Sequence, residues 1–349
     1  MTEAALIEVP ADDAILTVEG LHTFIGTDTG VVRAVDGVSF TLGRGEILGL
    51  VGESGSGKSV TCRTLMGLMP SPPAWWSGEV RYAGAPGRNL LVARERELQR
   101  LRGAHLSMIF QDPMSALNPV MRVGDQIEEA VGAHERLGPR ERRRRTLELL
   151  DRVGIPAASR RLRSYPHEFS GGMRQRVLIA VAIASRPKVL FADEPTTALD
   201  VIIQDQILSL LLELQRDSGM SMVLVSHDLG VIAEMCDRIA VMYAGEIVEL
   251  TDATTLLTKP RHPYTISLLR SLPETEQRTR YLPSIVGTPP QLIDVEPGCR
   301  FAPRCPLAEQ ECREWTTELL TAEGAAHLVR CRRHDDARRT EAWPVQSFA

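Results

Sequence analysis

The chain has 349 residues, of which 43% are hydrophobic and 24% are charged. That composition is typical of a folded globular protein and excludes a disordered, collagen-like or coiled-coil chain. The longest apolar run, Val177 to Ala184, is far shorter than the roughly 18 residues that a membrane-spanning helix needs. The N-terminus is acidic without a secretory signal pattern, and a net charge of −5 gives no general attraction for nucleic acid. We expect a globular protein that stays where it is made.

The first half of the chain begins with strands. Short apolar stretches separated by Gly and Asp predict strands joined by turns over residues 15–50. A Gly/Ser-rich loop begins at Gly52 and leads into a segment with helical spacing. Residues 70–87 are rich in Pro and Gly and predict turns. The elements expected next are a charged helix over 92–103, a strand over 106–112 and a mostly helical insertion over 113–169.

The second half alternates helices with continuous apolar strands, which are typical of a parallel sheet buried on both faces. The expected helices are 173–185 and 205–219, the expected strands are 188–195 and 221–228, and a hairpin-like pair covers 238–250. This alternation predicts the α/β class. Pro, Arg and His become frequent after Thr258. The expected parts are a tail over 1–14, a domain over 15–258 with a helical subdomain at about 113–175, and an extension over 259–349.

Residues 52–59, GESGSGKS, fit the phosphate-binding pattern G-x-x-x-x-G-K-[ST]. The glycines let the backbone curl so that its amides face phosphate oxygens. Lys58 supplies a cation for the β and γ phosphates, and Ser59 offers a hydroxyl to Mg²⁺. A strand-like segment before the loop and a helical segment after it match this motif. A plain glycine turn with an incidental lysine is the disfavoured alternative.

Two adjacent acids follow the apolar segment LFA, at Asp193 and Glu194. Asp193 would end a strand at the carboxyl edge of the sheet, where α/β proteins bind ligands, and could present its carboxylate to Mg²⁺. Glu194 is a candidate to polarise the attacking water. Alone, such a pair could also be turn residues, but a P-loop in the same chain favours the catalytic interpretation.

Further short motifs accompany these two in a fixed order. They are Gln111 after the LSMIF segment, FSGGMRQR at 169–176, TALD at 197–200 and VSHD at 225–228. The ordered set resembles the ATP-binding cassette of ABC transporters over roughly residues 15–255. The resemblance implies a P-loop NTPase fold of the RecA-like kind, with an antiparallel β subdomain and a helical subdomain. The signature departs from the usual LSGGQ, since Phe169 and Met173 occupy its outer positions.

The resemblance also implies residue roles in an ATPase that works as a dimer. Glu194, His227 and Gln111 would be catalytic, with His227 on the γ-phosphate and Gln111 near Mg²⁺ and coupled to a transmembrane partner. Ser59, Gln111 and Asp193 would hold Mg²⁺. The signature would face ATP held by the opposite subunit, and Asp200 would lie across the dimer interface. The ATP-binding residues would be Phe24 (stacking on adenine, or alternatively a core residue), Gly52, Ser54, Gly55, Ser56, Gly57, Lys58, Ser59, Val60, Ser170, Gly171, Gly172 and Asp200.

Three further segments are similar to the ATPases of oligopeptide, dipeptide and nickel importers. They are QDPMSALNP at 111–119, RHPYT at 261–265 and CRFAPRCPLAEQEC at 299–312. This resemblance implies two permease subunits, a second ATPase subunit and an extracytoplasmic binding protein as partners, at the cytoplasmic face of the cell membrane. A nickel or metal-chelate importer is the alternative. A soluble repair or translation ATPase is disfavoured by the single P-loop and the lack of long heptads, and a nonhydrolytic cassette by Glu194 and His227.

The C-terminal segment carries four of the six cysteines: Cys299, Cys305, Cys312 and Cys331. Disulfides are uncommon where an ATPase works, so grouped thiols suggest a metal or cluster. Zinc sites of four cysteines usually show paired C-x2–4-C hooks, which are missing here. Four thiolates on longer loops can hold a [4Fe-4S] cluster, as some similar proteins do. Zinc and unligated cysteines stay open as alternatives, and His327 or His334 could replace one cysteine in either metal site.

Overall fold

The computed structural model describes residues 13–271, 285–293, 295–315, 318–322 and 326–336. The chain forms two compact units. The first unit contains residues 1–43, 47–91 and 226–349, and the second contains residues 44–46 and 92–225. Within the described ranges, no helix combines the length and the apolar character that crossing a bilayer requires.

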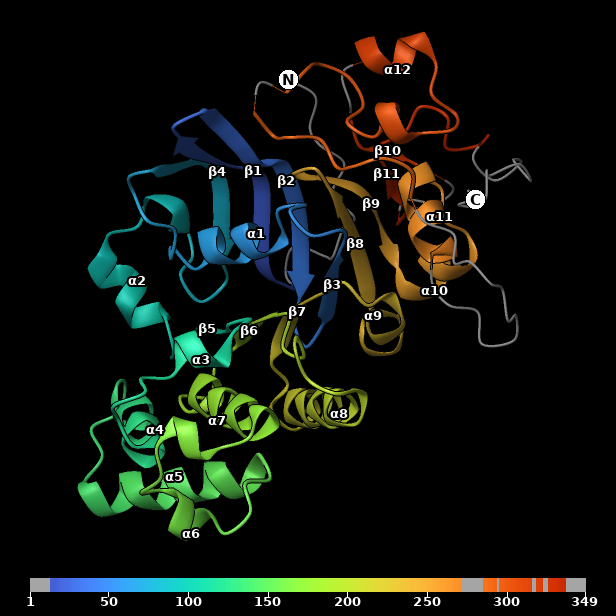
Figure 1. Ribbon diagram of the computed structural model, residues 1–349. Coiled ribbons are helices and arrows are strands. Elements are labelled where there is room, and N and C mark those ends of the chain that lie inside the picture. The colour runs from blue at the N-terminus through green and yellow to red at the C-terminus, as the bar shows by residue number, and fades with distance from the viewer. Residues whose placement is uncertain (1–12, 272–284, 294, 316–317, 323–325, 337–349) are drawn as a thin grey trace. The chain divides into compact units, whose positions relative to one another are not determined.

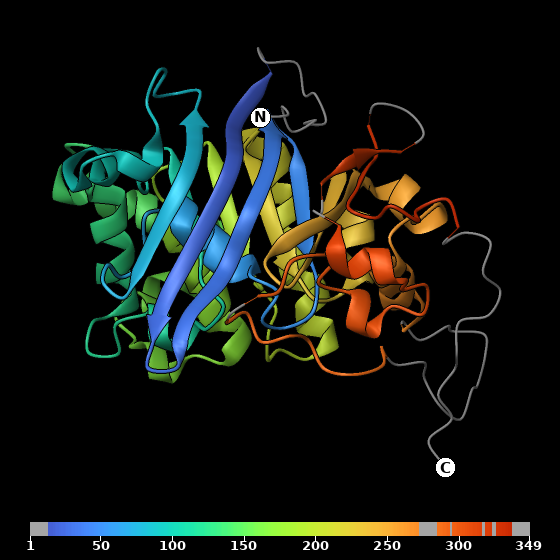
Figure 2. The ribbon, with the colours of Figure 1, turned by 90° about the horizontal axis from the view of Figure 1, so that it is seen from above.

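An antiparallel sheet of three strands lies in the first unit, in the order β2-β1-β4 (Figures 1 and 2). Its strands are β1 (Ala14–Thr27), β2 (Gly30–Gly43) and β4 (Ala74–Tyr82). The strand β4 overturns the prediction of turns over 70–87. Here Trp75, Trp76, Val80 and Tyr82 supply strand-favouring side chains, and pairing with β1 outweighs the Pro and Gly content. This sheet is the antiparallel β subdomain that the family resemblance implies.

The first unit also contains strands of a second sheet. One of them is β3 (Ile47–Val51), which is buried at every position. It pairs in parallel with β8 (Arg238–Tyr243), and β8 pairs antiparallel with β9 (Glu246–Asp252). Two short C-terminal strands, β11 (Leu328–Val329) and β10 (Leu320–Thr321), continue the sheet beyond β9. The C-terminal extension therefore adds strands to the sheet whose central strand leads into the P-loop.

Short helices complete the first unit. The α-helices are α1 (Lys58–Leu65), α9 (Leu229–Met235), α10 (Ala253–Thr258), α11 (Pro263–Arg270) and α12 (Gln310–Glu314), and the 3₁₀ helices are η1 (Leu90–Val92) and η3 (Ala302–Arg304). In Figure 1, α1 lies beside the antiparallel sheet, and α10 and α11 lie near each other on the side of β9. Asp252 begins α10 by accepting a hydrogen bond from the Thr255 N–H at 2.8 Å.

The second unit has three parallel strands, in the order β7-β6-β5. They are β5 (Leu106–Ile109), β6 (Val189–Asp193) and β7 (Ser221–Ser226), and each is buried along its length. Continuous burial explains their unbroken apolar sequence, as predicted. The carboxyl ends of β5 and β6 lead directly to Gln111 and Glu194.

Helices make up the rest of the second unit, and Figure 1 shows α4 to α7 grouped together. The predicted helical insertion is confirmed, although it is broken into short helices. The helices of this unit are α2 (Glu95–Leu101), α3 (Pro113–Ala116), α4 (Val123–Gly132), α5 (Pro139–Arg152), α6 (Ala158–Arg161), η2 (Pro166–Glu168), α7 (Gly171–Ile183) and α8 (Val201–Ser218). The breaks fall where proline begins a new helix, as at Pro113 and Pro139, or where Gly154 adopts a φ of 74°.

Candidate active site

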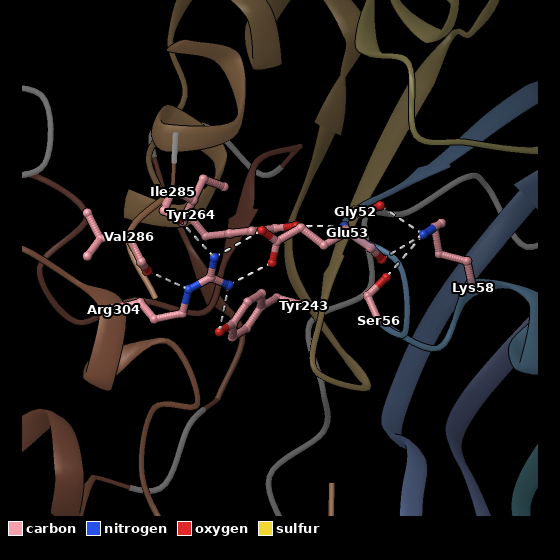
Figure 3. A network of polar contacts seen from close by, with 9 residues as sticks. All are labelled: Gly52, Glu53, Ser56, Lys58, Tyr243, Tyr264, Ile285, Val286 and Arg304. Atoms are coloured by element: carbon pink, nitrogen blue, oxygen red, sulfur yellow. Dashed lines mark hydrogen bonds and ion pairs between the residues drawn. The ribbon is translucent and has the colours of Figure 1, made fainter. Parts of the chain in front are cut away.

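The P-loop follows β3 and ends at the start of α1, as its motif requires. Lys58 is 4% exposed and points back into the loop, where its Nζ donates to the carbonyl oxygens of Gly52 at 2.8 Å and Glu53 at 2.9 Å (Figure 3). It also donates to Ser56 Oγ at 3.3 Å. The loop thus wraps around the ammonium group, and its role toward phosphate stays a prediction from the motif.

Two of the loop glycines have no room for a side chain. Gly52 has a φ of 151°, and a Cβ there would lie 2.1 Å from the carbonyl oxygen of Met242. Gly57 has a φ of 103°, and its Cβ would lie 2.4 Å from the carbonyl oxygen of Ala34. Gly55 differs, because a Cβ there would meet nothing within 4 Å. The base of the loop is therefore fixed by packing, whereas its tip is exposed.

Phe24, the candidate for adenine stacking, lies on β1 and is half-buried. Its ring stacks between those of His22, at 6.0 Å between centroids, and Trp75, at 5.9 Å. Trp75 is 47% exposed, so the stack reaches the surface. His227 belongs to the same unit and is exposed just after β7.

The second unit brings two predicted catalytic residues into direct contact. Glu194 follows the buried Asp193 at the end of β6 and adopts a φ of 47°. Gln111 Nε2 donates to Glu194 Oε2 at 3.0 Å. Thr197 Oγ1 donates to the same oxygen at 2.7 Å. Gln111 and Thr197 thus both hold the carboxylate of Glu194, and Thr197 begins the TALD segment, for which the resemblance implied a role only at Asp200.

The signature and the TALD segment begin two helices of the second unit. Ser170 is exposed and caps α7, where its Oγ accepts from the Met173 N–H at 3.4 Å. Asp200 caps α8, where its Oδ1 accepts from the Ile203 N–H at 3.0 Å. Gly172 packs against Ile203, and a Cβ at Gly172 would lie 2.6 Å from its Cγ2. The two motifs therefore support each other through a contact that only glycine permits.

The four C-terminal cysteines line one small hollow of the first unit, together with apolar neighbours that include Phe301 and Leu307. All four are free thiols. Burial raises the pKa of Cys299 and raises those of Cys305 and Cys331 to about 12, so these thiols are protonated at neutral pH. Across the described ranges, no group of three or more His, Cys, Asp or Glu side chains is arranged to hold a metal ion.

Neither of the two histidines considered as replacement ligands is among the residues that line the hollow. His327 is buried, and its Nε2 lies 2.7 Å from Glu249 Oε1. His334 Nδ1 lies 2.9 Å from the carbonyl oxygen of Cys331. Glu249 is fully buried and also accepts the backbone N–H groups of Arg261 at 2.7 Å and His262 at 2.9 Å. His327 thus helps to fix the start of the RHPYT segment.

Comparisons with known proteins agree with this geometry. Residues 35–197 match the family described as ABC transporter, and residues 248–312 match the oligopeptide/dipeptide transporter C-terminal region. The dipeptide transport ATP-binding protein DppD of Bacillus subtilis is 46% identical over 91% of this chain and 94% of its own length. DppD of Escherichia coli is 49% identical over 86% of this chain and 91% of its own length.

A solved structure extends the match to three dimensions. The ATP-binding cassette MJ0796, in a dimeric post-hydrolysis state bound to ADP and Pi, has a TM-score of 0.61 and 27% identity. It covers 68% of this chain and 98% of its own. The P-loop, the oriented Glu194, the signature helix and these similarities agree. The chain therefore belongs to the ATP-binding subunits of ABC transporters, in the family that carries the oligopeptide/dipeptide transporter C-terminal region.

Proposed function

We propose that this chain hydrolyses ATP to power the import of dipeptides or oligopeptides through two permease subunits at the cytoplasmic face of a cell membrane. The names of the relatives, dipeptide and oligopeptide transport ATP-binding proteins, support the substrate class. The observation that carries the hydrolytic part is the carboxylate of Glu194, which Gln111 and Thr197 hold in one orientation. A carboxylate fixed in this way can accept a proton from a water attacking the γ-phosphate.

The remaining site residues have proposed roles in binding. The P-loop amides and Lys58 bind the β and γ phosphates, Phe24 stacks on adenine, and His227 contacts the γ-phosphate. Oxygen donors suit Mg²⁺, and the hydroxyl of Ser59, the amide of Gln111 and the buried carboxylate of Asp193 are of that kind. When bound, the ion neutralises phosphate charge. These residues hold, orient and neutralise the nucleotide, while Glu194 handles the proton.

A second ATPase subunit, either a copy or a relative, is proposed to complete the site. Ser170 and Gly171 are exposed at the start of α7, where backbone amides suit an anion. Val201 and Ile202, directly after Asp200, are 79% and 72% exposed. Adjacent exposed apolar side chains beside two nucleotide motifs suit a surface that another subunit covers.

The hydrolytic role is tested by Glu194→Gln, which keeps the hydrogen-bonding shape and removes the base. We expect turnover of ATP to fall by about a hundredfold or more, while ATP binding persists and ATP-dependent dimers accumulate. Glu213→Gln, an exposed carboxylate on α8, is the matched control. Unaltered hydrolysis by the Glu194 variant would contradict the assignment.

The substrate class needs a separate test in cells. In a strain lacking this chain, we expect uptake of labelled dipeptide or oligopeptide to be lost and to return with the wild type but not with Glu194→Gln. Nickel uptake in the same strain addresses the alternative importer. Loss of nickel uptake with peptide uptake intact would replace the peptide assignment by the metal one.

We also propose that the four cysteines hold a [4Fe-4S] cluster. The donor set fits, because four thiols line one hollow whose other walls are largely apolar. Cys299, Cys305, Cys312 and Cys331 would hold the cluster as thiolates.

Anaerobic purification followed by iron, sulfide and zinc analysis and a visible absorption spectrum tests the cluster. We expect iron and sulfide with broad visible absorption, lost in Cys312→Ala. Colourless, iron-free protein with intact thiols would refute the cluster, and stoichiometric zinc would support the alternative.

A further inference from the structure

Glu53, the second residue of the P-loop, is held at all of its polar groups (Figure 3). Its backbone N–H donates to Tyr264 Oη at 2.8 Å, and its carbonyl oxygen accepts from Lys58 Nζ at 2.9 Å. Its carboxylate accepts two parallel hydrogen bonds from Arg304, at 2.7 Å from Nη1 and 3.0 Å from Nη2. Two of these partners come from the C-terminal extension, far from the P-loop in sequence.

Arg304 is itself fixed before it reaches Glu53. Its side chain is 5% exposed, and its Nε donates to the carbonyl oxygen of Val286 at 2.9 Å. Nη1 also donates to Tyr243 Oη at 3.3 Å, and the guanidinium lies 5.7 Å from the centroid of that ring. A guanidinium held in this way loses little further conformational freedom when it binds a carboxylate. Arg304 can therefore fix the orientation of Glu53.

A cluster of aromatic rings surrounds the residues that contact Glu53. Tyr243 and Tyr264 are buried with centroids 4.6 Å apart, and Phe301 packs against both at 5.3 and 5.5 Å. Phe301 and Arg304 both lie in the segment 299–305, which begins and ends at cysteines of the hollow. The segment therefore contributes Phe301 to the aromatic cluster and Arg304 to the contact with Glu53.

The rest of the P-loop tip lacks comparable support. Ser54 and Gly55 are exposed, and a Cβ at Gly55 would meet nothing within 4 Å. Phosphate binding requires the loop amides to converge on the phosphate oxygens. If the free loop is loosely held, the entropic cost of ordering it weakens the binding of the nucleotide. A fixed residue next to the exposed tip reduces that cost, and here the fixed residue is Glu53.

We propose that the segment 299–305 and Tyr264 form a clamp that positions the P-loop for ATP, with Arg304 and Tyr264 acting through Glu53. Both are positioning residues, because neither is proposed to touch the nucleotide. The clamp rests on the proposed binding of ATP at the P-loop and is independent of the transported substrate.

A double-mutant cycle on ATP affinity tests the clamp. The full chain and its Arg304→Gln, Glu53→Gln and double variants are titrated with a fluorescent ATP analogue, and KM and kcat are measured for ATP. We expect each single variant to raise Kd by about tenfold, and the double variant to raise it no further than either single one. KM should rise in parallel while kcat stays within about twofold. Tyr264→Phe, which removes only the hydroxyl, should raise Kd by about threefold.

Arg332→Gln is the matched control, because Arg332 lies in the extension and pairs with the exposed Glu311. The clamp is refuted when Arg304→Gln changes Kd no more than this control, or when the Arg304 and Glu53 effects multiply in the double variant. Where Arg304→Gln fails to fold, Arg304→Lys keeps the charge without the fork, and an unchanged Kd in that variant also refutes the clamp. A wild-type chain that binds no ATP would instead contradict the proposed function.

Discussion

The hydroxyl of Thr197 offers a sharp test of how the catalytic carboxylate is oriented. Thr197→Ala removes the 2.7 Å hydrogen bond to Glu194 Oε2 and keeps the 3.0 Å bond from Gln111. A hydrogen bond to a charged group is worth about 1.5–3 kcal/mol, and the half-buried position of Glu194 brings this to about 1–1.5 kcal/mol. That free energy corresponds to about a five- to twelvefold lower kcat.

The assay is steady-state ATP hydrolysis with KM and kcat determined separately. We expect KM to stay constant, because the hydroxyl contacts the base rather than the P-loop. Thr197→Ser keeps the donor and should retain most of the rate. Thr196→Ala changes the neighbouring threonine and serves as the control. A Thr197→Ala variant that turns over as fast as the Thr196→Ala variant would show that the Thr197 hydroxyl is not needed to orient Glu194.

Three further predictions concern stability and assembly. Glu249→Ala leaves two buried backbone N–H groups and His327 without their acceptor, so we expect a loss of about 3 kcal/mol in calorimetric unfolding, against no loss for the exposed Glu311→Ala. His22, at 2.8 Å, and Arg300 lower the pKa of Asp36 to about 2, so its stabilising effect is complete above a pH of about 4 and is lost as the pH falls toward 2. Asp36→Asn should therefore cost more stability at pH 7 than at pH 3 in denaturant titrations, and an equal cost at both would contradict this. Ile202→Glu should reduce ATP-dependent dimerisation of Glu194→Gln in size-exclusion chromatography without weakening ATP binding, since the side chain is 72% exposed; unchanged dimers would place the interface elsewhere.

The sequence alone predicts the parts of the site that are built from residues close together in the chain. Only glycine fits beside the carbonyl oxygens of Met242 and Ala34. The P-loop glycines therefore occupy fixed positions, which makes the motif recognisable in the sequence. The contact between Gln111 and Glu194 follows from two buried parallel strands that end side by side. The ATP-site roles of Phe24 and His227 remain predictions.

Sequence patterns do not predict the contacts that single side chains make with residues far away in the chain. Arg304 lies in an arginine-rich sequence, so nothing local distinguishes it from arginines that only face solvent. Tyr264 belongs to a recognisable segment, yet its bond to the Glu53 N–H depends on the packing of α11. The strand β4 was missed for a related reason, since its stability comes from pairing with β1 rather than from its own Pro- and Gly-rich surroundings.

The division of the chain into units has a consequence for the order of folding during synthesis. The second unit is almost continuous in sequence, so its residues leave the ribosome together. The first unit is interrupted, and Arg304 lies 251 residues after its partner Glu53. In the nascent chain, the P-loop therefore lacks its contact with Arg304 until the entire second unit has been synthesised. We therefore expect the P-loop to reach its full affinity for nucleotide only after the segment 299–305 has been made.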